Sequence, residues 1–458
     1  MPKAMQEIAG PEPITNFLSL LKFFRALNKD SIGMLQSQKD TYGGMSLIEI
    51  LGDNQLIVSD PELFREILVT KSKSFHKGHD YKDTKKGLAR FLGNGIIVSD
   101  GEFWKKQRKL VQPAFHVNRI KEYADTMGQY TEDMLKNWQN LDSVDVAHEM
   151  MLLTLRIVAR TLFHTDVREN ATDIATTMEA LNETSGQNTL LPTWIPTPQE
   201  LTARKAIRDM DDYVYALIAE RRQHEEDNGD LLSMLLLAEG DDGTRMSDKE
   251  VRDEAVGLFL AGHETTANAL NWVFYLLAKN PDVAEKLHEE LDLVLAGRTP
   301  TMQDLRDLPY TDMVIKEAMR WMPPVSGVGR TAIEDVEIGG YLIEKDTSLL
   351  LNFYSVHHDE NYWDNPSEFR PERFAPEHDT DRHRYAYLPF GGGARVCVGN
   401  SFAMMEAQIL LATIAQHYTL SLAPNQEVTP VARITTYPKD GLPMSIKKRV
   451  PNLVPELA

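Results

Sequence analysis

The only cysteine in the 458-residue chain, Cys397, lies in a glycine-rich segment. A single cysteine excludes intramolecular disulfides and the zinc or iron–sulfur sites that need several cysteines. The segment reads Phe390-Gly391-Gly-Gly-Ala-Arg395-Val-Cys397-Val-Gly399. Its glycines let the backbone approach a planar ligand and turn N–H groups toward the sulfur, and such hydrogen bonds tune metal-bound thiolates. The pattern predicts a thiolate that binds a metal cofactor, and a buried structural cysteine is the alternative.

The residues on either side of Cys397 favour its ionised form. An apolar helix is predicted from Phe402 to Gln416, so the cysteine lies just before a helix N-terminus, where the helix dipole stabilises a thiolate. Arg395 is suited to bind a carboxylate on the cofactor. A nucleophilic cysteine with a histidine base stays open, because the sequence does not show which histidine lies nearby.

A second set of polar residues interrupts an otherwise apolar helix. Residues 247–250 form a Ser-Asp-Lys-Glu capping box, apolar residues then recur at helical spacing, and the run ends before Pro281. A helix of ~33 residues is about 50 Å long. Its middle reads Ala261-Gly-His-Glu264-Thr265-Thr, although glycine and threonine weaken a helix interior. Because local rules tend to fail at functional sites, this segment is a site candidate.

Two further pairs have the spacing of neighbours on one helix face. Glu317 and Arg320 are three residues apart, and Trp104 and Arg108 are four apart. A charged pair at this spacing is usually a surface ion pair of little value, and a tryptophan usually packs in a core. Neither pair indicates a functional site when it is taken alone.

The elements that must hold these residues form a mainly α fold with a smaller β-rich portion. Helical periodicity dominates residues 60–320. Short β-rich runs occupy residues 327–356 and 420–446, and a loop rich in Pro, Gly, Asp and Arg covers residues 358–396. No linker divides the chain, so we expect a single domain over residues 1–458 with no fused reductase.

The composition excludes several classes of partner. The net charge of −19, from 49 basic and 68 acidic residues, argues against nucleic acid, which needs a basic surface. No window approaches the ~20 apolar residues of a membrane span. The apolar stretch from Phe17 to Leu27 is shorter, and we expect an amphipathic helix that packs on the body rather than a membrane anchor. Without a signal sequence, a cytoplasmic protein is predicted.

The motifs taken together resemble those of the cytochrome P450 family. Phe-x-x-Gly-x-Arg-x-Cys-x-Gly matches the family's haem-binding loop at every fixed position. Residues 261–266 resemble the oxygen-activating segment of the family's central helix, and Glu317-x-x-Arg320 with Arg373 resembles its charged triad. The matches extend over about residues 104–433 in the family's order.

The resemblance implies haem b, with Cys397 as the ligand of the iron. Other residues would contact this cofactor: Trp104, Arg108, Arg330, Arg395, Phe390, Gly391, Gly399, Ala261 and His79. A buried structural triad would support the cysteine loop: Glu317, Arg320 and Arg373. The substrate pocket would be lined by Ile97, Leu258, Ala261, Val325, Val328 and Thr436.

The resemblance also implies a reaction, in which dioxygen hydroxylates an apolar substrate. Thr265 would hold a water or oxygen ligand, and Glu264 would relay protons from solvent. A fatty acid is the first expectation for the substrate, and a terpenoid or steroid is the second. The protein would be a monomer whose electrons come from a separate ferredoxin or flavodoxin, attracted by the basic segment 105–109. An isomerase, dehydratase or peroxygenase of the family, or a non-enzymatic haem protein, is the alternative, but none of these needs both Glu264 and Thr265.

Overall fold

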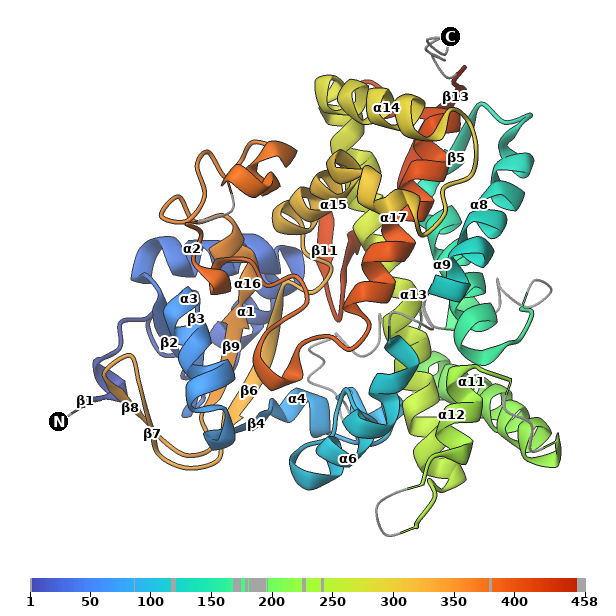
Figure 1. Cartoon of the computed structure of the whole chain (residues 1–458). Coiled ribbons are helices and arrows are strands. Elements are labelled where there is room, and N and C mark those ends of the chain that lie inside the picture. The colour runs from blue at the N-terminus through green and yellow to red at the C-terminus, as the bar shows by residue number, and fades with distance from the viewer. Residues whose placement is uncertain are drawn as a thin grey trace.

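The computed structural model describes residues 2–85, 87–116, 121–167, 174–177, 180, 195, 197–224, 228–239, 243–378 and 381–450. Helices make up most of the molecule, and the largest sheet lies to one side of them, together with the N-terminal helices (Figure 1). The predicted mainly α fold with a smaller β-rich portion is therefore confirmed.

The longer helices carry most of the framework. Their bounds are α1 (Phe17–Lys29), α2 (Ser31–Tyr42), α6 (Gly101–Val111), α8 (Ala124–Trp138), α9 (Val146–Phe163), α11 (Pro198–His224), α12 (Leu231–Leu237), α13 (Asp248–Lys279), α14 (Pro281–Leu295), α15 (Pro309–Trp321) and α17 (Asn400–His417). Shorter helical turns include α3 (Pro61–Arg65), α4 (His79–Lys82), α5 (Ala89–Leu92) and α16 (Phe353–His357).

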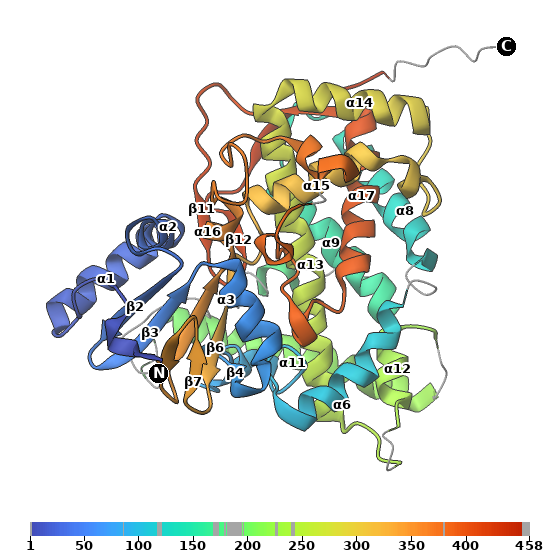
Figure 2. The same ribbon diagram turned by 60° about the vertical axis from the view of Figure 1, so that its left-hand side comes forward.

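Helix α13 runs through the centre of the helical part, with α9, α11, α15 and α17 packed around it (Figure 2). It begins at the predicted capping box, where the Ser247 hydroxyl accepts from Glu250 N at 3.3 Å and Glu250 accepts from Ser247 N at 2.8 Å. Most of its side chains are buried, as expected of a helix that other helices surround. The predicted central helix is confirmed.

The largest sheet has five strands in the order β2–β3–β9–β6–β4. Their bounds are β2 (Met45–Ile50), β3 (Asp53–Val58), β9 (Ser348–Asn352), β6 (Gly327–Ala332) and β4 (Phe75–Lys77). Alternate residues such as Leu349 and Leu351 are buried against Phe64 of α3 and form a second hydrophobic core, separate from the core around α13.

Three smaller sheets complete the fold. Their strands are β1 (Lys3–Ala4), β8 (Tyr341–Ile343) and β7 (Val336–Ile338), then β10 (Tyr418–Ser421), β13 (Pro443–Lys448) and β5 (Ser143–Asp145), and last β11 (Pro430–Ala432) and β12 (Thr436–Pro438). The antiparallel pair β11–β12 forms a hairpin whose tip, residues 433–435, points toward α13.

The expected long loop over residues 358–396 is present but is not wholly irregular. It contains short 3₁₀ helices at Pro371–Phe374, Pro376–His378, Arg384–Ala386 and Gly393–Arg395. The prolines at the start of the first two explain these turns, because proline suits the first position of a helical turn and cannot continue a longer one.

Helix α1 packs on the body as expected, but only through one face. Leu20 is 6% exposed, whereas Phe17, Leu18 and Leu21 are 62%, 71% and 41% exposed. Among the described residues, no helix is long and apolar enough to cross a membrane.

Candidate active site

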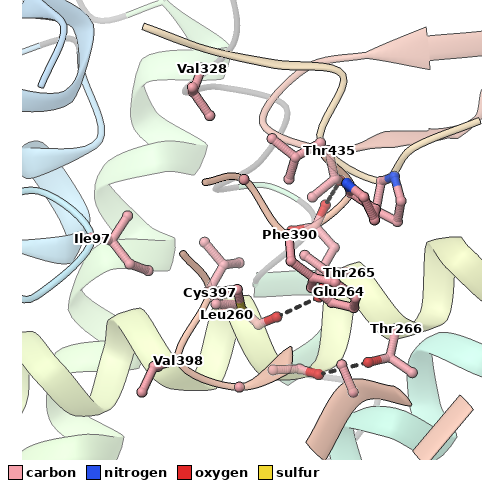
Figure 3. Close-up of a pocket in the computed structure, with 18 of the residues that line it drawn as sticks. Ile97, Leu260, Glu264, Thr265, Thr266, Val328, Phe390, Cys397, Val398 and Thr435 are labelled. Carbon is pink, nitrogen blue, oxygen red and sulfur yellow. Dashed lines mark hydrogen bonds between the residues drawn. The ribbon is translucent and has the colours of Figure 1, made fainter. Parts of the chain in front are cut away.

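A cavity of about 330 Å³ lies between the cysteine loop and the middle of α13. Cys397 and Phe390 reach it from the loop, Glu264 and Thr265 from α13, and Thr435 from the β11–β12 hairpin (Figure 3). Its walls are largely apolar, and they come from segments far apart in the sequence.

Two glycines shape the cysteine loop. Gly391 and Gly393 have φ values of +69° and +68°, in the left-handed region that side chains disfavour. A Cβ atom on Gly393 would lie 2.1 Å from the Leu68 carbonyl oxygen, whereas one on Gly391 would meet nothing within 4 Å. The turn is closed by Cys397 N, which donates to Phe390 O at 2.9 Å. The loop therefore needs glycine at position 393 for packing and leaves open space at position 391.

The side chain of Cys397 is exposed to the cavity and surrounded on its other sides by protein. Burial raises the pKa of its thiol, while the Gly399 N–H and the Arg108 guanidinium act in the opposite direction. A metal cation would shift this balance to the thiolate, which is the form that binds iron. The thiol is thus accessible from the cavity, where a metal could bind it.

The cavity wall contains a cluster of three cations: Arg330 is buried, and Lys77 and Arg395 are partly buried. Burial lowers the pKa of all three: that of Lys77 falls well below its usual range and that of Arg395 falls to about 10. One carboxylate, Asp100, attracts each of them and forms an ion pair with Arg395. Among the described residues, Asp100 is the one carboxylate that attracts these three cations, and it also pairs with Lys82 at 2.7 Å. The cluster therefore has positive charge left for a ligand, and the two propionates of haem fit this requirement.

Three other residues expected at the cofactor do not line the cavity: Trp104, Arg108 and His79. The Trp104 ring lies under the Arg395 guanidinium at 4.1 Å, and Arg108 donates to the Val396 carbonyl at 2.8 Å. Neither belongs to the cavity wall, and His79 is exposed on the outside of α4. Lys77, two residues before His79, lies at the cavity instead. Nothing in the sequence distinguishes this lysine from the others, so sequence reasoning missed it.

The middle of α13 forms the opposite wall. Ala261 and Thr265 line the cavity, and the Thr265 hydroxyl donates to the Ala261 carbonyl at 2.8 Å. Gly262 allows close packing here, because a Cβ atom on it would lie 2.9 Å from the Val158 side chain. Glu264 is 4% exposed and accepts from the Thr435 hydroxyl at 2.5 Å. The expected acid and alcohol therefore both reach the cavity, and Glu264 also bonds to the hairpin.

The apolar part of the wall agrees with the expected pocket except at one position. Ile97, Leu258, Val325 and Val328 line the cavity together with Phe390, Gly391 and Gly399 of the cysteine loop. Thr436 does not, because it lies in strand β12 behind the wall, and its neighbours Thr435 and Ile434 line the cavity instead. The two lining residues belong to the tip of the hairpin, whereas Thr436 already belongs to the paired strand and lies opposite Ala432.

A buried ionic cluster supports the loop before the cysteine. Glu317 pairs with Arg320 at 2.8 Å and with Arg373 at 2.9 Å, and none of the three side chains is more than 5% exposed. The remaining guanidinium donors bind backbone carbonyls, including those of Pro366 and Asp364 at 2.9 Å each. The charged groups thus satisfy one another and fix the backbone of residues 364–368.

A family model described as cytochrome P450 matches residues 8–442 of the chain. The chain belongs to the cytochrome P450 family. Cyclooctatin synthase of Streptomyces melanosporofaciens is 37% identical over 377 residues, which are 81% of each protein. Pentalenene oxygenase of Streptomyces avermitilis is 32% identical over 419 residues, which are 91% of this chain and 92% of the relative.

The fold of this P450 also matches a solved structure. Retinoic acid-bound cyanobacterial CYP120A1 superimposes with a TM-score of 0.86, covering 97% of this chain and 100% of that one at 24% identity. As a P450, the protein is a haem-iron monooxygenase that hydroxylates apolar substrates and depends on dioxygen and a redox partner.

Proposed function

We propose that the cavity binds haem b, that Cys397 would bind its iron, and that Lys77, Arg330 and Arg395 would bind its propionates. The observation that supports this most strongly is that one cavity contains a thiol and a cluster of three cations, for which the described residues supply one carboxylate. Phe390, Gly391, Gly399 and Ala261 would contact the ring. Trp104 and Arg108 would support the site indirectly, by stacking under Arg395 and by holding the Val396 carbonyl beside the ligand.

Haem bound in this way supplies the oxygen-activating chemistry of a thiolate-ligated iron. The chain's own residues would bind the substrate, exclude water and move protons. Thr265 lies on the cavity wall with a hydroxyl that can hold a water molecule. Glu264 is the buried carboxyl next to it and would pass protons from the hairpin side of α13. Ile97, Leu258, Val325 and Val328 would keep the substrate dry.

A terpenoid hydrocarbon or alcohol is the proposed substrate, ahead of a fatty acid. Among the described lining residues, the only basic side chains are the three proposed to hold the haem propionates, so no cation is left for a fatty-acid carboxylate. Two relatives are named for cyclooctatin and for pentalenene, and pentalenene is a terpenoid hydrocarbon. An apolar, uncharged ring system suits the aliphatic wall.

The proposed electron donor is an acidic ferredoxin or flavodoxin that docks beside α6. This helix carries Lys105, Lys106 and Lys109 on a chain whose net charge is −19, and Arg108 connects it to the loop of Cys397. Opposite charges would raise the association rate, and added salt would lower it. We propose that the enzyme acts as a cytoplasmic monomer.

The test is the absorption spectrum of the reduced protein with carbon monoxide. We expect the strongly red-shifted band of a thiolate-ligated haem, and loss of that band in Cys397→Ser. A folded, haem-loaded protein without this band would contradict the proposal. Titration with pentalenene and with a long-chain fatty acid then separates the substrate classes, since we expect a substrate-type spectral shift only with the terpene.

A further inference from the structure

The hairpin β11–β12 contacts α13 through several hydrogen bonds, and the shortest of them involves Glu264. The Thr435 hydroxyl at the hairpin tip lies 2.5 Å from Oε1 of Glu264, and both side chains are buried (Figure 3). The same short tip carries Ile434, whose side chain lines the cavity. The residue that would relay protons is therefore bonded to a segment that also faces the substrate.

Two asparagines on α13 extend this bond into a chain. Asn268 Nδ2 donates to Thr435 Oγ1 at 3.1 Å, and Asn271 Nδ2 donates to Asn268 Oδ1 at 3.2 Å. Because Asn268 is a donor to the hydroxyl, the hydroxyl proton is left to point at Glu264. Every donor in the chain is thus directed toward the carboxyl group, and this arrangement stabilises its ionised form.

The hairpin is fixed in this position by two hydrogen bonds to the backbone of Thr436, the residue directly after the tip. Thr436 N donates to the Pro324 carbonyl at 2.8 Å, and Trp272 Nε1 donates to the Thr436 carbonyl at 3.0 Å. The Thr435 hydroxyl therefore cannot drift away from α13 without breaking buried bonds.

We propose that Thr435 is a positioning residue for Glu264, and that its hydroxyl, oriented by Asn268, holds the carboxylate ionised on the hairpin side of α13 between proton transfers. The proposal rests on the proposed function, in which Glu264 relays protons. A neutral carboxyl is a weaker acceptor than a carboxylate, so protonation of Glu264 loosens the bond to Thr435. The protonated group can then turn toward the cavity, release its proton there and return.

The other titratable groups on the packed elements are engaged elsewhere. The His263 imidazole bonds through Nδ1 to the Phe259 carbonyl, and Arg433 of the hairpin donates to Asn28 at 3.3 Å. Glu406 of α17 is fully buried beside Thr266, which lies two residues after Glu264 on α13. Removing the Thr435 hydroxyl therefore changes a hydrogen bond to Glu264 and leaves the charged groups around it as they are.

Infrared titration of the haem-loaded enzyme tests this directly. The carbonyl stretch of the protonated Glu264 carboxyl is identified as the band lost in Glu264→Gln, which separates it from the buried Glu254 and Glu406. In Thr435→Val, which keeps the volume and removes the hydroxyl, we expect Glu264 to become an about tenfold weaker acid, since a bond to a charged group is lost. Thr435→Ser keeps the hydroxyl and should titrate like the wild type, and Asn268→Ala should show a smaller change in the same direction.

Dioxygen consumption by the reduced holoenzyme, measured in H2O and D2O, separates the two levels of the proposal. If Glu264→Gln leaves the rate and its isotope effect unchanged, the proton relay in the proposed function is wrong. If Glu264→Gln slows consumption while Glu264 titrates identically in wild type and Thr435→Val, the positioning role is overturned and the relay stands. Slower consumption in Glu264→Gln, together with a weaker Glu264 acid in Thr435→Val that Thr435→Ser restores, supports both.

Discussion

The Nε atom of Arg373 lies 2.9 Å from Oε1 of Glu317, although 56 positions of the chain separate them. Both side chains are almost completely buried, and Arg320 binds the same carboxylate. A buried carboxylate shared by two guanidinium groups is stable only while all partners are present, because each charge left alone would be desolvated without compensation.

Removing the shared carboxylate should therefore strongly destabilise the folded protein. We expect Glu317→Ala to lower the free energy of unfolding by about 3–5 kcal/mol, since two arginines lose their buried counter-charge. Urea denaturation with haem absorbance as a second probe measures this. The matched control is Glu102→Ala, which breaks the exposed pair with Lys105 and should leave stability unchanged within error. Equal effects of the two variants would contradict the structural role of the triad.

Removing a positive charge from the cation cluster should lower the affinity for haem and raise the stability of the haem-depleted protein. We expect Lys77→Met and Arg330→Leu to lower haem affinity by ~10–100-fold, the value of one charge-assisted bond. Haem transfer to apomyoglobin measures this affinity. Burial lowers the pKa of Lys77 well below its usual range, so removing its charge should stabilise the haem-depleted protein. Lys105→Met on the exposed face of α6 is the control, and an equal loss of haem from it would refute the assignment.

The two glycines of the cysteine loop should differ although their φ values agree. Gly393→Ala places a Cβ atom 2.1 Å from the Leu68 carbonyl, and we expect destabilisation by about 1–3 kcal/mol beyond the backbone strain. Gly391→Ala meets open space and carries the backbone strain alone. If haem contacts Gly391, that variant should lose haem affinity more than stability. Thermal unfolding and haem transfer, measured on both variants, check the contrast, and identical stabilities would disprove it.

The hydroxyl of Thr265 should matter for the use of electrons rather than for binding. In Thr265→Ala we expect continued consumption of reductant with at least about tenfold less product per electron pair, because proton delivery is impaired. Substrate-induced spectral shifts should be unchanged. Thr265→Ser retains the hydroxyl and should restore the product yield. An alanine variant with normal yield would remove Thr265 from proton delivery.

The buried carboxyl of Glu254 should make stability depend on pH. Burial raises its pKa to about 8, and only Oε2 has a described partner, the N–H of Ile96 at 3.1 Å. The folded state therefore binds a proton that the unfolded state has released, and stability falls as pH rises from about 5 to about 8. In Glu254→Gln this fall should diminish, with a difference from wild type of at most about 1.4 kcal/mol per pH unit. Glu289→Gln, on the exposed side of α14, should leave the pH profile of urea denaturation unchanged; a change as large as that in Glu254→Gln would contradict the assignment.

The sequence predicted the parts of the site that are local in the chain. The cysteine loop, the central helix with Glu264 and Thr265, and the pair Glu317–Arg320 are each contained in a few consecutive residues, and short-range spacing is enough to indicate them. Arg373 could be added only through the resemblance to a family. These elements account for the metal ligand, the helix and its supporting charges.

Residues that act through tertiary proximity were not predicted. Lys77 and Asp100 meet Arg330 and Arg395 because strands β4 and β6 pair beside the start of α6, and no spacing in the sequence encodes that meeting. His79, chosen for its chemistry, lies on the exposed side of the same segment. The expected Thr436 is one position beyond Thr435, which lines the cavity, because the hairpin presents its tip to the cavity and the exact residues of that tip depend on how the two strands pair.

The loop that carries Ile97 is attached to the first turns of α13 through its backbone. Asn94 N donates to Asp253 at 2.9 Å and Ile96 N donates to Glu254 at 3.1 Å, so these bonds do not involve the side chains that face the cavity. The hairpin segment is likewise held through the backbone of Thr436. Residues such as Ile97 and Ile434 can therefore be exchanged during evolution without changing the path of their loops. Such an arrangement lets a lineage acquire new substrates one side chain at a time while the oxygen chemistry stays intact.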